Sequence, residues 1–190
     1  MNPDRPRAAR TSETDPIAVS PVPADLGDRG GRLGVTFAPG KKAPSSFGGH
    51  WHRDLPADLG RLAGRYGVDV LVSLVEEDEL VLLGIPDLVQ EAERHGIAVL
   101  RLPIPDGGTA DPGAARQVIQ AAASLAMSGR HVVFHCRGGL GRAGTLAACA
   151  LVHLGVRPDD AITTVRRARP HAIENVHQER FVRDFAAAAR

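Results

Sequence analysis

Two patterns of apolar and polar positions alternate along the chain from residue 33 onward. The run 68–75 is apolar on both faces, as buried parallel strands are, and further strands are predicted at 97–102 and 131–135. The stretch 33–37 is typical of a short edge strand. Apolar residues at helical spacing predict helices at 56–66, in two short stretches ending near residue 95, at 112–128, from 141 or 142 to 154, from 158, and around 181–185.

Capping residues support two of these helices. Asp111 precedes Pro112, which combines an N-cap acceptor with a proline at the first helical position, and Gly129 follows the last turn. Gly67 ends the helix at 56–66.

Strands that alternate with helices predict an α/β fold, a single domain whose mostly parallel central sheet is flanked by helices on both faces. Ligands bind such sheets beyond the carboxyl ends of the strands, which directs attention to the segment after His135.

Residues 1–31 differ from the rest of the chain. They contain five prolines and almost no apolar periodicity. Such a segment does not bury enough surface to offset the entropy lost when it becomes ordered. We therefore expect a flexible, proline-rich tail at 1–31 and a catalytic domain at 32–190.

Composition narrows the class of protein. A chain of 190 residues with 43% hydrophobic and 24% charged residues suits one globular domain plus a tail. A formal net charge of +1 gives no broad attraction to nucleic acid or to an anionic membrane. The sequence contains neither a run approaching the roughly 20 apolar residues of a membrane span nor a signal-peptide core. Two cysteines cannot build a disulfide scaffold. We expect a cytoplasmic monomer with no nucleic-acid or membrane partner.

The segment from His135 to Thr145 carries the candidate chemistry. It reads HCRGGLGRAGT and places Cys136 between a strand end and a helix start. Amides at a helix N-terminus and the glycines of the loop form a nest for a tetrahedral oxyanion, and the same field favours the thiolate of Cys136. Arg142 offers a planar fork for two phosphate oxygens. This combination predicts phosphoryl transfer through a cysteinyl-phosphate. The predicted phosphate-binding residues are Arg137, Gly138, Gly139, Leu140, Gly141 and Arg142.

The reaction also needs a general acid, because an alkoxide is a poor leaving group. Two aspartates lie between the strand at 97–102 and the next helix. Asp111 is explained as a helix cap, whereas Asp106 follows Pro105 in a Gly-Gly loop that can close over a substrate. We predict that Asp106 acts as the acid in the first step and as the base for water in the second.

The signature segment resembles that of the cysteine-dependent protein tyrosine and dual-specificity phosphatases, and the chain is most similar to their kinase-associated phosphatase subgroup. The similarity spans residues 33–186 and includes Asp106-Gly107-Gly108 and, near the C-terminus, Ala172-Ile173-Glu174 and Gln178. It implies a protein tyrosine phosphatase-like fold and a phosphorylated protein partner such as a kinase, with no metal or other cofactor. Phosphotyrosine is the implied substrate, and phosphoserine and phosphothreonine stay open. The resemblance also implies that Gln178 positions the hydrolytic water.

One residue departs from the family's pattern. The family usually has Ser or Thr after the arginine, with a hydroxyl that supports the departing thiolate, but this chain has Ala143. Thr145 faces elsewhere once the helix has begun, so we expect a slower second step. His135, before the cysteine, is expected to support the loop through hydrogen bonds.

Several other polar residues have structural explanations. Cys149 lies in an apolar helix and is expected in the core. Lys41 and Lys42, the only lysines of the chain, are expected in a solvated loop. The acidic run 76–79 is expected at a solvated helix start, where negative charge complements the helix dipole.

Alternative functions stay open at this point. Residues 139–144 match G-x-G-x-x-G, but no second strand follows to carry the ribose-binding acid of a dinucleotide site. A pseudophosphatase would bind phosphate with the same residues and no turnover. A sulfurtransferase or an arsenate reductase also uses a cysteine loop, although no resolving cysteine is apparent. The substrate of a phosphatase could also be a small phosphorylated metabolite or a lipid. His50 and His52 have no third ligand nearby, so no metal site is predicted.

Overall fold

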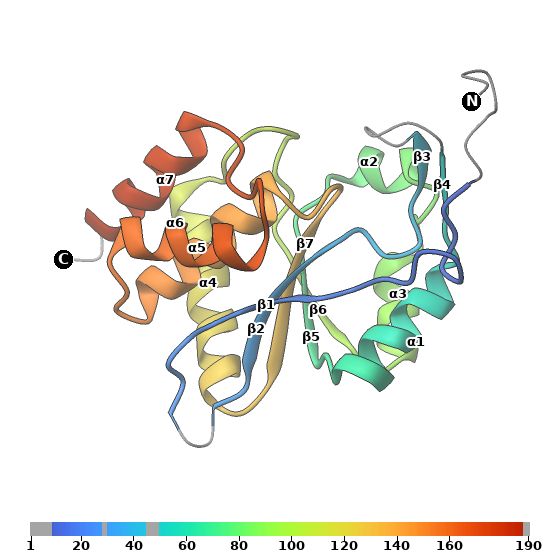
Figure 1. Cartoon of the computed structure of the whole chain (residues 1–190), viewed down its shortest axis with the longest axis horizontal. Coiled ribbons are helices and arrows are strands. Elements are labelled where there is room, and N and C mark those ends of the chain that lie inside the picture. The colour runs from blue at the N-terminus through green and yellow to red at the C-terminus, as the bar shows by residue number, and fades with distance from the viewer. Residues whose placement is uncertain (1–8, 28–29, 45–49, 188–190) are drawn as a thin grey trace, which may run out of the picture.

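A central sheet of five strands organises the protein (Figure 1). The structure is a computed structural model, which describes residues 9–27, 30–44 and 50–187. The strand order is β1-β2-β7-β5-β6, and all neighbours are parallel except β1, which is antiparallel to β2. The bounds of these strands are β1 Ser20–Val22, β2 Arg32–Phe37, β5 Val70–Ser73, β6 Ala98–Arg101 and β7 His131–Cys136. Two short strands, β3 Lys42–Pro44 and β4 His50–His52, pair with each other separately.

Helices cover both faces of the sheet (Figure 1). The helices are α1 Leu55–Tyr66, α2 Glu77–Leu82, α3 Leu88–Arg94, α4 Pro112–Met127, α5 Gly141–His153, α6 Pro158–Ala168 and α7 Val176–Ala187. Successive residues of β7 point to opposite faces, as strand geometry requires. Phe134 packs into a core with α4 to α7, and Val133 packs into a second core with α1 and α3. The predicted α/β fold with a mostly parallel sheet is therefore confirmed.

The capping residues act as predicted. The Asp111 side chain accepts a hydrogen bond from the Ala114 amide at 2.9 Å, and α4 begins at Pro112. Gly67 ends α1 with a φ of 61°, a left-handed conformation that glycine adopts without strain. The observed ends of the predicted strands differ from the predicted ones by no more than two residues.

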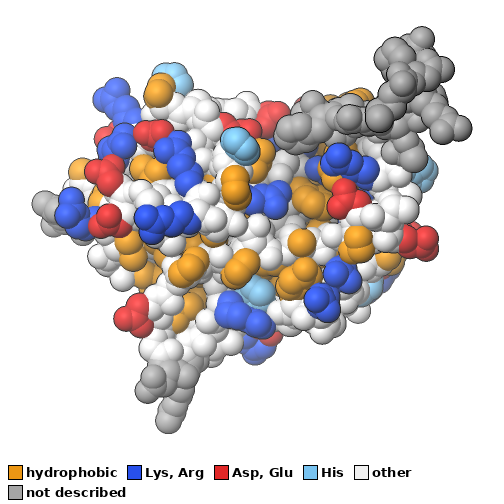
Figure 2. All heavy atoms as spheres, in the orientation of Figure 1, with side chains coloured by type: hydrophobic (Ala, Val, Ile, Leu, Met, Phe, Trp, Pro, Cys, Tyr) orange, Lys and Arg blue, Asp and Glu red, His pale blue; other side chains and the backbone are white. Residues whose placement is uncertain are grey.

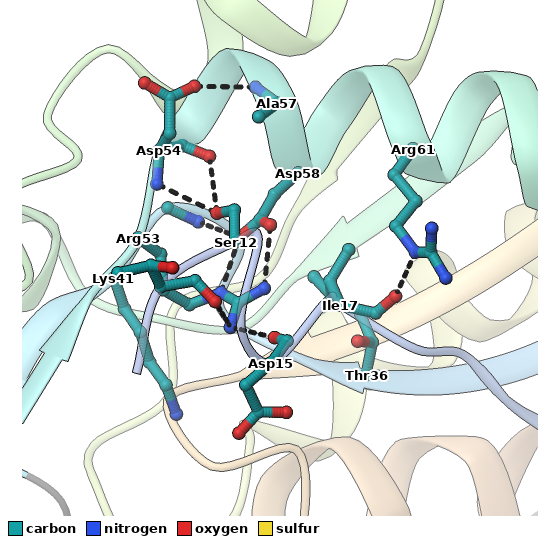
Figure 3. Close-up of polar contacts among 12 residues, drawn as sticks. Ser12, Asp15, Ile17, Thr36, Lys41, Arg53, Asp54, Ala57, Asp58 and Arg61 are labelled. Atoms are coloured by element: carbon teal, nitrogen blue, oxygen red, sulfur yellow. Dashed lines mark hydrogen bonds and ion pairs between the residues drawn. The ribbon is translucent and has the colours of Figure 1, made fainter. Parts of the chain in front are cut away.

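The N-terminal part of the fold differs from both expectations about it. The predicted edge strand β2 lies inside the sheet, because β1 pairs with its outer side. The segment 9–27 lies against the domain: Ile17 is fully buried, and Arg53 donates a hydrogen bond to the Asp15 carbonyl at 2.6 Å (Figure 3). Pro21 is compatible with an edge strand, where a missing amide need not be paired. The expected boundary at residue 31 therefore falls inside the folded unit, and residues 1–8 lie outside the described residues.

Charge is distributed over the surface that Figure 2 shows. Acidic and basic side chains lie interspersed on this face, in keeping with the formal net charge of +1. Among the described helices, none is long and apolar enough to cross a membrane.

Candidate active site

The predicted signature segment joins the end of β7 to the start of α5. Its turn requires glycine at Gly139, which has a φ of 69° and where a Cβ would collide with the Thr36 carbonyl. Within the described part of the chain, the amides of residues 137–141 donate to no protein acceptor. These free donors at a helix N-terminus are the features of an anion-binding nest.

A cavity of about 260 Å³ lies against this loop. The cavity brings together Cys136, Arg142 and Asp106, the three residues predicted to be catalytic. Other elements contribute the rest of its wall. The complete lining consists of Lys41, Ala43, Pro44, Trp51, Asp106, Cys136, Arg137, Gly138, Leu140, Gly141, Arg142 and Glu174.

Arg142 is held rigidly although it lines the cavity. Its side chain donates to both carboxylate oxygens of Glu79 at 2.6 and 2.8 Å, to Asp106 Oδ1 at 2.8 Å and to the Ile104 carbonyl at 2.9 Å. Burial alone favours the neutral form, but the Glu79 hydrogen bonds and the charge of Cys136 outweigh it and raise the pKa of Arg142. The guanidinium is therefore charged and held in one orientation on the cavity wall. Both hydrogens of Nη1 and both of Nη2 are paired, so a phosphate that binds through Nη2 must displace Asp106 from it.

Glu79 is a site residue that the sequence analysis missed. The run 76–79 was expected to be solvated, and Glu77 and Asp78 are indeed exposed. Glu79 is buried beside Leu80, and its carboxylate meets Arg142, which lies 63 positions further along the chain. Helical spacing indicates which side of α2 is buried, but it does not indicate which charged residue of another element lies against that side.

Lys41 also differs from its expected place in a solvated loop. It is 6% exposed, it lines the cavity, and its Nζ donates to the Arg137 carbonyl at 3.1 Å. The ammonium lies 4.5 Å from the ring centroids of both Phe37 and Trp51. Burial, followed by the charge of Arg53, lowers the pKa of Lys41 to about 8.

His135 supports the loop in a different way from the one expected. Its ring is fully buried, and neither nitrogen makes an aligned hydrogen bond to any described residue. Burial lowers the pKa of His135 to about 3, and the approach to the Cys136 backbone offsets only part of this effect. His135 is therefore a neutral packing residue, and the predicted hydrogen bonds are absent among the described residues.

Arg169 makes the hydrogen bonds that His135 does not. It donates from Nε to the Gly139 carbonyl at 3.1 Å and from Nη2 to the Gly138 carbonyl at 3.2 Å. Because the N–H and C=O of one peptide plane point in opposite directions, these bonds direct the following amides away from Arg169. No sequence pattern signals this residue, which the sequence analysis missed.

Gln178 is buried and joins two parts of the site. Its Oε1 accepts from the Glu174 amide at 2.8 Å, and its Nε2 donates to the Gly108 carbonyl at 3.3 Å in the loop that carries Asp106. A Cβ on Gly141 would collide with the Glu174 and Gln178 side chains, so both lie directly against the loop at its junction with α5. The role of Gln178 in positioning water stays a prediction.

Three more residues with predicted roles lie in α5. Ala143 is buried and brings no hydroxyl, and the Thr145 hydroxyl donates to the Gly141 carbonyl at 2.7 Å within its own helix. Cys149 is in the core, where burial raises its pKa far above the usual thiol range.

No three His, Cys, Asp or Glu side chains in the described part of the chain are arranged to hold a metal ion.

Comparison with known proteins agrees with this geometry. The family model described as "Swiss Army Knife protein, DSP-PTPase phosphatase domain" matches residues 44–182. The Mus musculus protein named Cyclin-dependent kinase inhibitor 3 is 31% identical over 176 residues, which cover 91% of this chain and 80% of the relative. The Homo sapiens Protein tyrosine phosphatase type IVA 3 is 37% identical over 89 residues, which cover 44% of this chain and 49% of the relative.

Solved structures give the same result. A crystal structure of kinase associated phosphatase, with its catalytic cysteine replaced by serine, matches with a TM-score of 0.77 and 27% identity, covering 90% of this chain and 97% of that one. The crystal structure of Tk-PTP in its active form matches with a TM-score of 0.65 and 27% identity, covering 88% and 97%. The chain therefore belongs to the DSP-PTPase phosphatase family and is a cysteine-dependent protein phosphatase.

Proposed function

We propose that this phosphatase hydrolyses protein phosphotyrosine through a cysteinyl-phosphate on Cys136. The observation that carries the proposal is the convergence of Cys136, Arg142 and Asp106 on one cavity beside the free amides of residues 137–141. In the first step the Cys136 thiolate attacks phosphorus, an S–P bond forms and the P–O bond to the substrate breaks. Arg142 and the loop amides stabilise the equatorial oxygens, and Asp106 gives its proton to the leaving oxygen.

The second step regenerates the thiol site. Water attacks phosphorus and gives a proton to Asp106, the S–P bond breaks, and Cys136 leaves as a thiolate together with inorganic phosphate. Gln178 orients this water, since its side chain lies over Gly141 and bridges to the loop of Asp106. His135 keeps the loop in place by packing beneath it.

The apolar residues in the wall of the cavity favour an aromatic substrate. Trp51, Pro44 and Ala43 line one side, and the ring of phosphotyrosine can pack against them while its phosphate reaches Cys136. The shorter side chains of phosphoserine and phosphothreonine leave this apolar wall uncovered. We therefore rank phosphotyrosine above both.

A phosphorylated kinase is the partner that we propose. Support comes from the relatives, one named Cyclin-dependent kinase inhibitor 3 and one a kinase associated phosphatase. The enzyme is proposed to act on this partner as a monomer.

Hydrolysis of p-nitrophenyl phosphate at pH 5–8 with a metal chelator present tests the proposal. Turnover that vanadate inhibits, that Cys136→Ser abolishes and that is faster on phosphotyrosine than on phosphothreonine peptides is the expected result. No turnover by folded wild-type protein would indicate a phosphate-binding module instead. Faster hydrolysis of a phosphoinositide or a sugar phosphate than of any peptide would indicate a lipid or metabolite phosphatase.

A further inference from the structure

We propose that Lys41 is a second cationic phosphate-binding residue of this site, an inference that rests on the function proposed above. Lys41 comes from the segment before β3, far in sequence from the loop that starts at Cys136. Lys41 nevertheless lines the same cavity as Cys136 and Arg142, and its Nζ donates to the Arg137 carbonyl at 3.1 Å. A buried ammonium on the wall of an anion site is a costly feature that binding of an anion would repay.

Two aromatic rings hold this ammonium without neutralising it. The rings of Phe37 and Trp51 lie 5.4 Å apart, and the Lys41 Nζ is 4.5 Å from the centroid of each. Cation–π contacts attract a positive charge through the ring quadrupole but contribute no negative charge. The rings therefore place the ammonium and leave its charge available to a ligand.

Arg53 shows the opposite arrangement on the same two rings. Its guanidinium lies 4.9 Å from the Phe37 centroid and 5.6 Å from the Trp51 centroid. However, it donates to both carboxylate oxygens of Asp58, at 2.7 and 2.8 Å, and lies outside the cavity lining (Figure 3). Among the described residues, no carboxylate lies within ion-pair distance of Lys41. Arg53 is thus charge-matched and structural, whereas Lys41 lines the site and has no carboxylate partner among the described residues.

Most charged groups around Lys41 are positive, so a bound anion would stabilise its protonated form. Arg53, Arg169 and Arg137 disfavour its protonated form, and a Cys136 thiolate favours it. A dianionic phosphate beside Nζ adds a second favourable interaction, so its binding raises the pKa of Lys41 above about 8. By linkage, phosphate binds more weakly once Lys41 has lost its proton.

NMR titration of the lysine side chains tests this inference without an activity readout. The chain has only two lysines, so protein labelled with ¹⁵N-lysine gives two side-chain signals, and the exposed Lys42→Met variant assigns them. In the presence of saturating inorganic phosphate, the titration midpoint of Lys41 is expected to rise by about one pH unit or more, and that of Lys42 to stay in place. A Lys41 midpoint that phosphate does not move would overturn the inference.

Kinetics of three variants separate phosphate binding from support of the loop. Lys41→Met keeps a flexible unbranched side chain between the rings, Lys41→Arg keeps the charge, and Lys42→Met is the matched control. For Lys41→Met we expect KM for p-nitrophenyl phosphate and Ki for phosphate to rise roughly 10- to 100-fold, with a smaller change in kcat. We expect the kcat/KM of the wild type to fall above about pH 8, because Lys41 loses its proton there, and we expect this fall to be absent in Lys41→Met. Lys41→Arg is expected to restore most of the binding. Equal losses of kcat in the Met and Arg variants, with the pH profile unchanged, would show a structural role only.

The two proposals fail separately in these experiments. Turnover by wild-type protein without a phosphate-dependent shift at Lys41 overturns the inference and leaves the phosphatase function intact. A phosphate-dependent shift in a protein that turns over no substrate overturns the proposed function and leaves Lys41 as an anion-binding residue.

Discussion

The two cysteines are almost equally buried, yet they lie in opposite chemical surroundings. Cys136 is 3% exposed and Cys149 is fully buried. Cys136 directly precedes the free amides of residues 137–141 and shares a cavity with Lys41 and Arg142. Cys149 lies further along the same helix among apolar side chains, where burial raises its pKa. We therefore expect the reactivity of each cysteine to depend on the charges and free donors beside its sulfur, which burial alone does not predict.

The largest effect is expected when each cysteine is replaced by serine, which compares the two sulfur atoms directly. For Cys136→Ser we expect kcat/KM for p-nitrophenyl phosphate to fall by at least about 10⁴-fold, with little change in the free energy of unfolding. For Cys149→Ser we expect near wild-type activity and a free energy of unfolding lower by about 1–3 kcal/mol, because a hydroxyl is buried among apolar groups. Steady-state kinetics and urea denaturation measure both effects. Similar losses of activity in the two variants would show that the two cysteines do not differ in their importance for the reaction.

Replacement of Asp106, the proposed proton donor, tests how much the surroundings of Cys136 contribute to the reaction. For Asp106→Asn we expect roughly a 10²- to 10³-fold loss of kcat on phosphotyrosine and a smaller loss on p-nitrophenyl phosphate, whose leaving group needs less protonation. Rates across aryl phosphates of increasing leaving-group basicity measure this difference. Asp111→Asn is the matched control, since asparagine also caps a helix. A loss that does not vary with the leaving group would contradict the assignment of Asp106.

His135, next to Cys136, predicts a dependence of stability on pH. Its pKa is about 3 in the fold against 6.5 for an unperturbed histidine, so between these values the unfolded chain binds more protons. Its contribution to stability is therefore fully present above pH 6.5 and is lost progressively toward pH 3. From pH 7 to pH 5 this costs about 2 kcal/mol.

Urea denaturation at pH 7 and pH 5 tests this prediction on wild type and His135→Asn. The variant is expected to lose about 2 kcal/mol less than wild type over the same pH interval. An identical pH dependence in the two proteins would show that His135 is not the buried neutral group described here.

The smallest effect is expected at Ala143, one residue after Arg142. A hydroxyl in Ala143→Ser can donate to the departing thiolate and is worth about 1 kcal/mol, or about fivefold in the rate of cysteinyl-phosphate breakdown. Rapid-quench kinetics with ³²P-labelled substrate measure the trapped intermediate, which should decrease in the variant. An unchanged rate of breakdown would show that the missing hydroxyl does not slow the second step.

The elements and the reactive loop were predictable from sequence because the forces that define them are local. Apolar periodicity and caps such as Asp111 and Gly67 act within a few residues, and they located the helices and most of the strands. Cys136 and Arg142 lie within one segment of seven residues, so their spacing identified the anion nest. The place of Asp106 in the cavity agrees with its prediction for the same reason, since its loop follows a strand of the same sheet.

The sequence by itself thus determined the α/β fold, the signature loop and the chemistry that this loop can perform. Only the tertiary structure decided what surrounds the loop. Glu79 meets Arg142 across 63 residues and Lys41 meets Arg137 across 96, and β1 joins a sheet whose order does not follow the chain. Periodicity shows which side of an element is buried, but the partner of a buried charge is set by which elements become neighbours. That information exists only once the chain has folded.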